Sequence, residues 1–421
     1  MTRNLRLLIG AGLVFYLIGA VNQSVGMYVL AAACLAVILA CYSLTRLVIR
    51  GVTVELELES VRTRAGEQAN GVIRVRNAGA IRRTGMSLAL RVENETVAGG
   101  GRDYEFVLPA LGPRSRTDMD ICLQCSARGA HTIRSMRITA NDPLGVYHRW
   151  RAVDANTGFL GLPRAHSAER LANWDALSSE GRRSARVLRR AGGEFQGIRP
   201  HTPGDDPRMV HWKVTAHLGE LVVRQHRPRR EAGVTAWVDL WRPNHPFSGA
   251  DSPTETVISL TATLLDILLH GDTLVSLAGH GLPMDFAMPS RGEAYLDRSL
   301  LTLAEAVPTE GLSFSQFCEE QARVSPRLRN VFVVTPAAEP ALVDVLALIR
   351  NRGARVVVLF AGGLEQQAES VPDRLRAHAH DQTIGALRGL GVCAVRVRDF
   401  DDIPRAISEV ASDQSSVAAA G

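Results

Sequence analysis

The sequence predicts a mixed α/β chain in three parts: two N-terminal transmembrane helices, a β-sandwich domain, and a doubly wound parallel sheet. Three patterns of apolar residues carry this prediction. The first is a run without any charged residue between Arg6 and Arg46, and the second is a series of short alternating segments from Val52 onward. The third is a regular succession of continuous apolar strands and amphipathic helices after residue 231.

The uncharged N-terminal run is about twice as long as one membrane span. As a single helix it would measure roughly 58 Å, whereas the hydrocarbon core of a bilayer is about 30 Å thick. The polar residues Asn22-Gln23-Ser24 divide it into two spans, near Leu7–Val21 and Val25–Thr45. Arginines flank the pair on both sides, which predicts a multi-pass protein of the inner cell membrane with soluble domains in the cytoplasm. A signal peptide ending near Ala20 is the alternative, and the second uncharged run argues against it.

From Val52 the apolar period changes to two, as in half-buried strands. VTVELELES is the first such segment, and GVIRVRN, MSLALRVEN, YEFVLP, DMDICLQCSA and TIRSMRITA follow with Gly, Asn and Pro between them. Several short strands over about a hundred residues are typical of a β-sandwich. This region contains no cluster of potential ligands, so we expect a spacer or binding module beside the membrane.

The last part alternates strands and helices, from VTAWVDLW at Val234 to IPRAISEVA at Ile403. Continuous apolar strands between amphipathic helices predict a parallel sheet that is covered on both faces. The predicted divisions are a transmembrane hairpin over 1–50, a β-sandwich domain over 51–150, a connector over 151–190, a signature motif segment over 191–230, an α/β domain over 231–412 and a tail over 413–421.

Composition excludes some functions. The chain has 46% apolar and 22% charged residues, which is typical of globular proteins. The net charge of +5 raises the question of nucleic acid, but 43 acidic residues are spread among 48 basic ones. We therefore expect no nucleic-acid partner, and the arginine clusters at 182–190 and 224–230 are interpreted as solvated surface. The six cysteines form no disulfide framework, and the C-x-x-C of Cys122 and Cys125 falls in a strand pattern that points the two thiols to opposite faces.

The densest group of polar residues is the stretch from Gly193 to Arg230. Pro203-Gly204 suits a turn, and Asp206 before Pro207 predicts the N-cap of a short helix over Arg208–Ala216. Met209 and Trp212 would share a face of that helix, and Gly219-Glu220 would turn the chain into the strand LVVRQ. Asp205 would then be free to pair with Arg199, Arg208 or Arg224. Two interpretations stay open: a salt-bridged structural turn and a docking surface for a partner.

This stretch resembles a known family. The pattern G-x-F-x-G-I-R-P-x-x-P-G-D-D-x-R-x-x-x-W-K-x-x-x-x-x-G-E-L-x-V-R is similar to the signature of the domain-of-unknown-function 58 family. RGAHTIRSMRITANDPLGVY at 128–147 looks like a segment that precedes the signature in that family. The resemblance implies a von Willebrand factor type A-like fold for the remainder, and a partnership with a MoxR-type AAA+ ATPase in the assembly of client proteins. It implies no catalytic residues and no cofactor. The motif residues that carry over as candidates for partner binding are Arg199, Pro203, Gly204, Asp205, Asp206, Arg208, Trp212, Lys213, Glu220 and Arg224, together with Gly219 and Leu221.

Two kinds of chemistry are alternatives to this interpretation. A metal-dependent hydrolase could use the His/Asp cluster of residues 201–217, formed by His201, Asp205, Asp206, His211 and His217. Their spacing matches no metal-site pattern, and adjacent carboxylates diverge in regular structure. The magnesium site of von Willebrand type A domains needs D-x-S-x-S after the first strand. Here Asp239 is present, but Trp241 and Pro243 replace both hydroxyl residues, which predicts a degenerate site that holds no metal. The sequence therefore predicts a non-enzymatic interaction protein.

Overall fold

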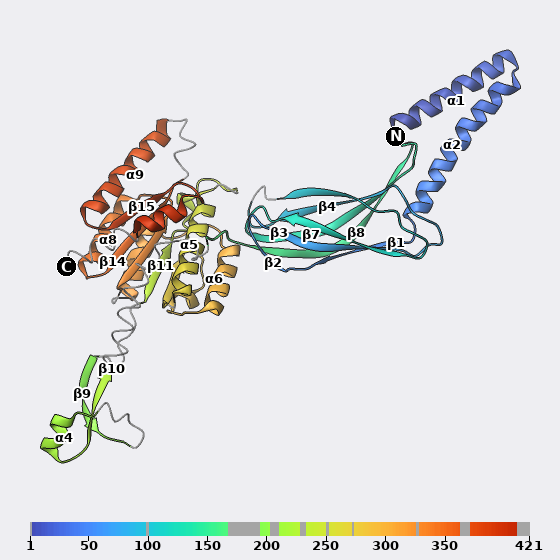
Figure 1. Cartoon of the computed structure of the whole chain (residues 1–421). Coiled ribbons are helices and arrows are strands. Elements are labelled where there is room, and N and C mark those ends of the chain that lie inside the picture. Colours follow the sequence, from blue (N-terminus) through green and yellow to red (C-terminus); the bar gives the residue numbers. More distant parts are fainter. Residues whose placement is uncertain are drawn as a thin grey trace. The chain divides into compact units, whose positions relative to one another are not determined.

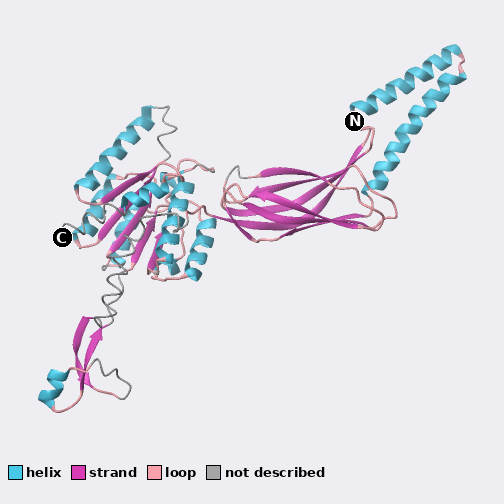
Figure 2. Ribbon diagram, viewed as in Figure 1, coloured by secondary structure: helices cyan, strands magenta, loops and turns pink. Residues whose placement is uncertain are grey.

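The computed structural model divides into two compact units, Met1–Arg164 and Ala165–Gly421. It describes residues 2–97, 101–166, 194–202, 210–227, 233–249, 252–271, 273–325, 328–362 and 371–410. The first unit contains two long helices and a β-sandwich (Figure 1). The second contains a two-stranded hairpin and a parallel sheet with helices, so helices and strands are mixed throughout the chain (Figure 2).

The N-terminal helices are α1 (Arg3–Asn22) and α2 (Val25–Ile49), and both are long and apolar enough to cross a membrane. They pack closely because α1 presents small residues. A Cβ on Gly12 would lie 3.3 Å from Cys34 Cβ, and one on Gly19 would lie 3.2 Å from Met27 Cβ. Glycines seven residues apart lie on one helix face, which allows two apolar helices to approach closely.

Two sheets form the sandwich, and they enclose one apolar core. Val54, Ile73 and Leu123 of one sheet share a cluster with Leu88 and Ile133 of the other. The sheets have the orders β1-β3-β6 and β2-β8-β7-β4-β5. The strands are β1 (Val52–Leu58), β2 (Arg62–Arg64), β3 (Gln68–Asn77), β4 (Met86–Asn94), β5 (Arg102–Val107), β6 (Arg116–Gln124), β7 (Gly129–Asn141) and β8 (His148–Leu162).

The strand-rich unit is longer than predicted. β8 pairs with β7 from Asn141↔His148 to Gly129↔Gly161, so it belongs to the sandwich. The predicted boundary at 150 therefore cuts through a strand, and the start of the predicted connector 151–190 is sheet. Residues 167–190 of that connector lie outside the described residues. Cys122 lies on β6 and Cys125 directly follows it, and the two thiols differ in burial as predicted, because Cys122 is exposed and Cys125 is buried.

A small hairpin, β9 (Glu194–Pro200) and β10 (Val222–Arg227), carries the ends of the motif segment. The two strands pair antiparallel, with Val222 opposite Pro200. The helix α4 (Trp212–Leu218) precedes β10, and Gly219 ends it in the left-handed conformation with a φ of 74°.

The second unit is built on a parallel sheet with the strand order β12-β11-β13-β14-β15. All four pairings in it are parallel, as the continuous apolar strands predicted. The strands are β11 (Val234–Val238), β12 (Val275–Gly279), β13 (Asn330–Thr335), β14 (Arg355–Ala361) and β15 (Cys393–Val397). The connecting helices are α5 (Pro253–His270), α6 (Glu293–Glu305), α7 (Phe314–Val324), α8 (Pro340–Asn351) and α9 (Val371–Gly389), with short 3-10 helices η3 (Arg242–Asn244) and η4 (Met284–Ala287).

The core of this unit lies against the sheet. Helix α5 is buried along most of its length and contacts four of the strands. Trp237 and Val333 point to a cluster that also contains Phe314 of α7 and Leu346 of α8. Helix α7 is absent from the sequence prediction, because it buries few apolar residues: Phe314, Cys318 and Ala322. A capping box of Ser313 and Gln316 begins it.

Candidate functional site

The motif residues are only partly placed. Pro203, Gly204, Asp205, Asp206 and Arg208 lie outside the described residues, so the predicted pairing of Asp205 is not tested. Two of the arginines lie on the hairpin: Arg199 on β9 opposite Val223, and Arg224 on β10 opposite Ile198. Trp212, Lys213 and Glu220 are exposed, and Trp212 is 65% exposed.

The predicted helix over Arg208–Ala216 is displaced. Val210 forms a β-bridge with Val223, and His211 N donates to Val222 O at 2.8 Å, so the chain is still extended there. The helix therefore begins at Trp212, with His211 rather than Asp206 at its N-cap. Gly219 sets its end at Leu218.

The histidines of the proposed cluster do not converge in the described part of the chain. His201 N donates to Leu221 O and His211 N donates to Val222 O, so these two residues lie on segments that pair with the start of β10. His217 is exposed on α4. Among the residues that the structure describes, no three His, Cys, Asp or Glu side chains gather to hold a metal ion.

A second polar group lies at the carboxyl edge of the parallel sheet, where Asp239 follows β11 and Thr335 ends β13. β11 and β13 are neighbours, while the chain connects β11 first to β12 on its other side. Such a reversal of strand order is where open α/β sheets commonly bind ligands. This edge is therefore the place in the described fold where a site is expected.

The Asp239 side chain is fully buried and accepts three hydrogen bonds. Oδ1 accepts from Trp241 N at 3.0 Å, and Oδ2 accepts from Asn244 Nδ2 at 2.8 Å and from Thr335 Oγ1 at 2.7 Å. The Thr335 hydroxyl also lies 3.0 Å from the Ala337 carbonyl, so it has a second acceptor available. Protein donors thus occupy both carboxyl oxygens.

A second layer of contacts extends this group. Asn244 Nδ2 also donates to Glu339 Oε1 at 2.9 Å, and Ser315 N lies 3.4 Å from Glu339 Oε2. His245 Nε2 lies 2.9 Å from the Asp239 carbonyl oxygen, and Thr254 Oγ1 lies 2.9 Å from His245 Nδ1. Loops after β11 and β13 are therefore joined to the starts of α5, α7 and α8.

Burial dominates the electrostatics of this group. It raises the pKa of Asp239 to about 7, against the hydrogen bonds from Thr335, Trp241 and Asn244, which lower it. The pKa of the buried Cys318 thiol lies well above its usual value, because of burial and then the nearby Asp239 and Glu339 carboxylates. Burial lowers the pKa of His280, on the loop after β12. The carboxyl group can therefore hold a proton near neutral pH.

These residues do not fit a magnesium ion. Mg²⁺ requires oxygen ligands in a near-octahedral arrangement. The groups that face the Asp239 carboxylate include a backbone N–H and an amide N–H, which are donors and cannot ligate a cation. The degenerate metal site that the sequence predicts is thus filled by hydrogen bonds.

The sequence identifies Asp239 and Thr335 as candidate members of this polar group. It does not identify Asn244, Glu339 and Ser315. Asn244 lies five residues after Asp239, and Glu339 directly precedes Pro340 at the start of α8. A polar residue just after a strand or just before a helix start was the available signal.

The outer surface of this edge is partly apolar. Trp241 is half-buried and its Nε1 donates to Gly311 O at 3.2 Å. The neighbouring Leu312 is 50% exposed, and its carbonyl oxygen lies 3.0 Å from His280 Nε2. The side chains of Trp241 and Leu312 thus lie at the surface beside the closed Asp239 group.

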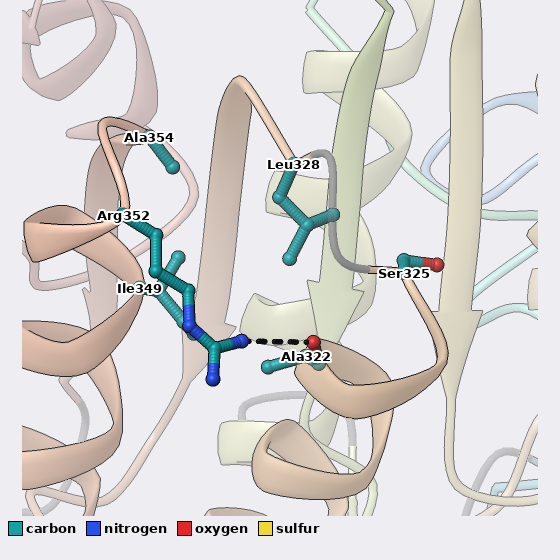
Figure 3. A pocket seen from close by; sticks show the side chains of 6 residues that line it. All are labelled: Ala322, Ser325, Leu328, Ile349, Arg352 and Ala354. Atoms are coloured by element: carbon teal, nitrogen blue, oxygen red, sulfur yellow. Dashed lines mark hydrogen bonds between the residues drawn. The ribbon is translucent and has the colours of Figure 1, made fainter.

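A small hollow lies at the opposite edge of the sheet, before β13 and β14. Figure 3 shows Arg352 donating to the Ala322 carbonyl oxygen at 3.3 Å beside Leu328 and Ile349. The space is about 10 Å³, which is no more than one water molecule needs. It lies away from Asp239 and is too small for a ligand.

Comparison with solved structures gives only distant likenesses. The CARDB domain of PF1109 from Pyrococcus furiosus is 15% identical with a TM-score of 0.16, over 25% of this chain and 94% of that domain. The sporulation control protein Spo0M from Bacillus subtilis is 11% identical with a TM-score of 0.17, over 36% of this chain and 58% of that one. Scores this low carry no argument about either unit.

Sequence comparison is more informative. The chain is 23% identical over 252 residues to the uncharacterized protein YeaD of Bacillus subtilis (strain 168), which is 58% of this chain. The match spans only 60% of that relative's length. Residues 197–405, which include the hairpin and the parallel sheet, match the family described as Protein of unknown function DUF58.

Proposed function

We propose that this chain is a membrane-anchored, non-catalytic interaction protein that works with a MoxR-type AAA+ ATPase. The observation that carries the non-catalytic part is the Asp239 group. Protein donors occupy both of its carboxyl oxygens at the place where an α/β sheet would otherwise bind a ligand. The motif resemblance is what supports the ATPase as partner.

The helix pair is proposed as the anchor, a multi-pass hairpin in the inner membrane with both units in the cytoplasm. Contacts between α1 and the sandwich favour this over a cleaved signal peptide. Thr2 Oγ1 donates to Val146 O at 2.5 Å, Asn4 Nδ2 donates to Leu144 O at 2.9 Å, and Leu5 is buried. Cleavage near Ala20 would remove partners that the folded sandwich uses.

For the parallel sheet we propose the von Willebrand factor type A-like, doubly wound arrangement. The strand order, the helices between successive strands and the position of Asp239 after the first strand support it. In this arrangement the carboxyl edge would serve as a protein contact rather than a metal-dependent one.

Two surfaces could meet the ATPase. The motif segment presents Trp212 and Lys213 on α4, both exposed, and the carboxyl edge presents Trp241. An exposed tryptophan offers a large apolar contact, and tryptophan is among the residues that most often dominate the binding energy of protein interfaces.

Crosslinking mass spectrometry on native membranes with nucleotide present tests the proposal. We would compare wild type with Trp212→Ala, Trp241→Ala and, as a matched control, Trp150→Ala in the sandwich, where the tryptophan is 56% exposed. We expect an ATPase to crosslink in wild type and Trp150→Ala and to be lost in Trp212→Ala. Loss only in Trp241→Ala would move the docking surface to the carboxyl edge. If no sample yields an ATPase, the proposed partnership is wrong.

A metal-dependent hydrolase that uses the His/Asp cluster of residues 201–217 is the second candidate. One observation favours it: His211 Nδ1 is enclosed and makes no hydrogen bond to any described group. Such a nitrogen is available to a metal or a substrate. Unchanged bound-metal content and hydrolytic activity after His211→Ala and Asp205→Ala, relative to wild type, would remove this candidate.

A further inference from the structure

The strand register brings four loops together at the end of the sandwich that adjoins α2. β1 begins at Val52 opposite Asn77, Met86 pairs with Ala140, and Asn141 pairs with His148. Residues 50–51, 78–85, 108–115 and 142–147 therefore lie at one end, which we call the helix-side rim. The described loop residues at the other end, the far rim, are 59–61, 65–67, 95–97, 101 and 125–128.

The two rims differ in charge. The helix-side rim carries three exposed arginines, Arg50, Arg82 and Arg114, and its acidic residue Asp142 is buried. The far rim carries three exposed glutamates, which are Glu59, Glu67 and Glu95. Arg128 of this rim is buried, and one exposed arginine, Arg164, lies beside Gly66 of the rim. A charge difference of this kind orients a protein against an anionic surface.

Two apolar side chains project from the helix-side rim. Ile81 is 47% exposed and Leu144 is 55% exposed. A buried polar side chain holds each of their loops in place. Asn77 Nδ2 donates to Ile81 O at 2.9 Å, and Asp142 accepts from Leu144 N at 2.8 Å. The loops are thus ordered while their apolar residues remain outside the core.

The helices locate these apolar residues at the depth where a bilayer would end. Leu144 lies beside the first turn of α1, because its carbonyl oxygen accepts from Asn4. Val146 of the same turn packs with Leu5 and Cys41, one residue from each helix. Ala78 N donates to Gly51 O at 2.9 Å, just past the end of α2. Both loops therefore adjoin the ends of the helices that would leave the membrane.

We propose that the helix-side rim rests on an anionic phospholipid surface, with Ile81 and Leu144 among the headgroups and Arg50, Arg82 and Arg114 against the phosphates. The proposal rests on the membrane anchoring proposed above and adds a defined orientation of the sandwich. Short apolar tips ringed by arginines and free of exposed carboxylates match the chemistry of an anionic leaflet.

Photo-crosslinking of the full chain in nanodiscs tests this orientation. A benzophenone amino acid would replace Ile81 or Leu144, with Val61 of the far rim, 71% exposed, as a matched control and Leu35 of α2 as a reference for anchoring. We expect lipid adducts at 35, 81 and 144 and none at 61. Adducts at 35 without adducts at 81 and 144 would overturn the rim proposal and leave the anchoring intact. Absence of adducts at 35 would overturn both.

The role of charge is tested in the same system. Nanodiscs of phosphatidylcholine alone would be compared with an equal mixture of phosphatidylcholine and phosphatidylglycerol. We expect the adduct yield at 81 and 144 to be several-fold higher in the anionic mixture, and to lose that difference in Arg50→Glu/Arg82→Glu/Arg114→Glu. Arg62→Glu near the far rim is the control and should retain it. Equal yields in both lipids, or adducts to a second copy of the chain in place of lipid, would contradict the proposal.

Discussion

Asp142 in the first unit and Asp239 in the second are both buried carboxylates that accept three hydrogen bonds, yet their donors differ. Asp142 is 5% exposed and accepts from three backbone N–H groups, those of Leu144, Val146 and Tyr147, over 2.8, 3.1 and 2.5 Å. Asp239 has no exposed surface and accepts from one backbone N–H, one amide and one hydroxyl.

The difference separates a local role from a long-range one. The three backbone donors to Asp142 lie within five residues of it, so these hydrogen bonds shape one turn. Thr335 lies 96 residues from Asp239, so that carboxyl group joins loops that only the folded sheet brings together. Loss of Asp142 should therefore disturb a hairpin, and loss of Asp239 should disturb the sheet.

Buried thiols allow both units to be followed in one full-length sample. Cys125 in the sandwich and Cys318 in the second unit are both fully buried. Each should become reactive only when its own unit unfolds. Labelling with a pyridyl disulfide across a urea series, followed by peptide mass spectrometry, then gives a free energy of unfolding for each unit.

The largest expected effect is a dependence of the second unit on pH. Asp239 has a pKa of about 7 in the fold and about 4 when unfolded. The folded state thus keeps a proton that the unfolded chain releases between those values. The contribution of Asp239, measured as the difference between wild type and Asp239→Asn in the Cys318 assay, should be greatest below about pH 4 and fall by on the order of 4 kcal/mol up to about pH 7. The buried His380, whose pKa burial lowers to about 4, changes the free energy of unfolding in the opposite direction in both proteins.

Asp239→Asn is the control for that titration, because an amide at this position cannot titrate. Its free energy of unfolding should keep the pH dependence of the other groups and lack the part that comes from Asp239. Parallel pH curves for the two proteins would mean that other groups cause the dependence.

Asp142→Ala should have the next largest effect, confined to the first unit. Three backbone N–H groups would lose their acceptor in a turn where Val146 is buried. We expect the Cys125 assay to show a loss of about 2–3 kcal/mol and the Cys318 assay to show none. Asp118→Ala is the matched control, since Asp118 pairs with Arg116 on the exposed surface and should give no measurable change. An equal loss in both units would contradict the division of roles.

Thr335→Val should have a smaller effect on the second unit. The isosteric change removes one donor to Asp239 and should cost roughly 1–2 kcal/mol in the Cys318 assay. Because that hydrogen bond lowers the pKa of Asp239, the pH-dependent fall should extend to higher pH than in wild type. Thr302→Val on α6 is the control, as its hydroxyl donates only to Arg298 O on an exposed helix. An unshifted pH curve would place Thr335 outside the group.

Gly145→Ala should give the smallest effect. Gly145 has a φ of 65°, and a Cβ there would lie 3.3 Å from Asn4 Nδ2. We expect a cost of about 1 kcal/mol in the Cys125 assay, because L-residues are disfavoured in this conformation. Gly10→Ala is the control, since a Cβ there meets nothing within 4 Å. A neutral Gly145→Ala would show that the turn adjusts freely.

Much of the fold could be predicted from the spacing of apolar residues along the chain alone. The elements that could not be predicted in this way have a physical cause. The strands that begin at Val52, Met86 and Asn330 each bury a regular set of side chains, so their pattern is visible. The first half of β8 is almost wholly exposed and carries no such pattern. Its pairing with β7 comes from the turn at Asp142, which a period analysis does not detect.

The candidate site was less predictable than the fold. Asp239 could be named because it follows an apolar strand, but its partners depend on which strands are neighbours. Glu339 and Thr335 reach Asn244 and Asp239 only because β13 lies beside β11. The predicted helix start, Arg208, differs from the observed start, Trp212. The cause is the pairing of Val210 with Val223, a contact that local propensity does not encode.

The path of the chain through the sandwich has a mechanical consequence. The chain enters at Val52, directly after α2, and leaves at Leu162, at the far rim. Tension between the helix pair and the second unit would therefore run along the strands. The hydrogen bonds that join β1 to β3 and β8 to β7 would be loaded together in shear, rather than opened one at a time. Force spectroscopy with attachment points at residues 50 and 165 should find a higher rupture force than attachment at 77 and 116, which peels β3 from β6 at one end.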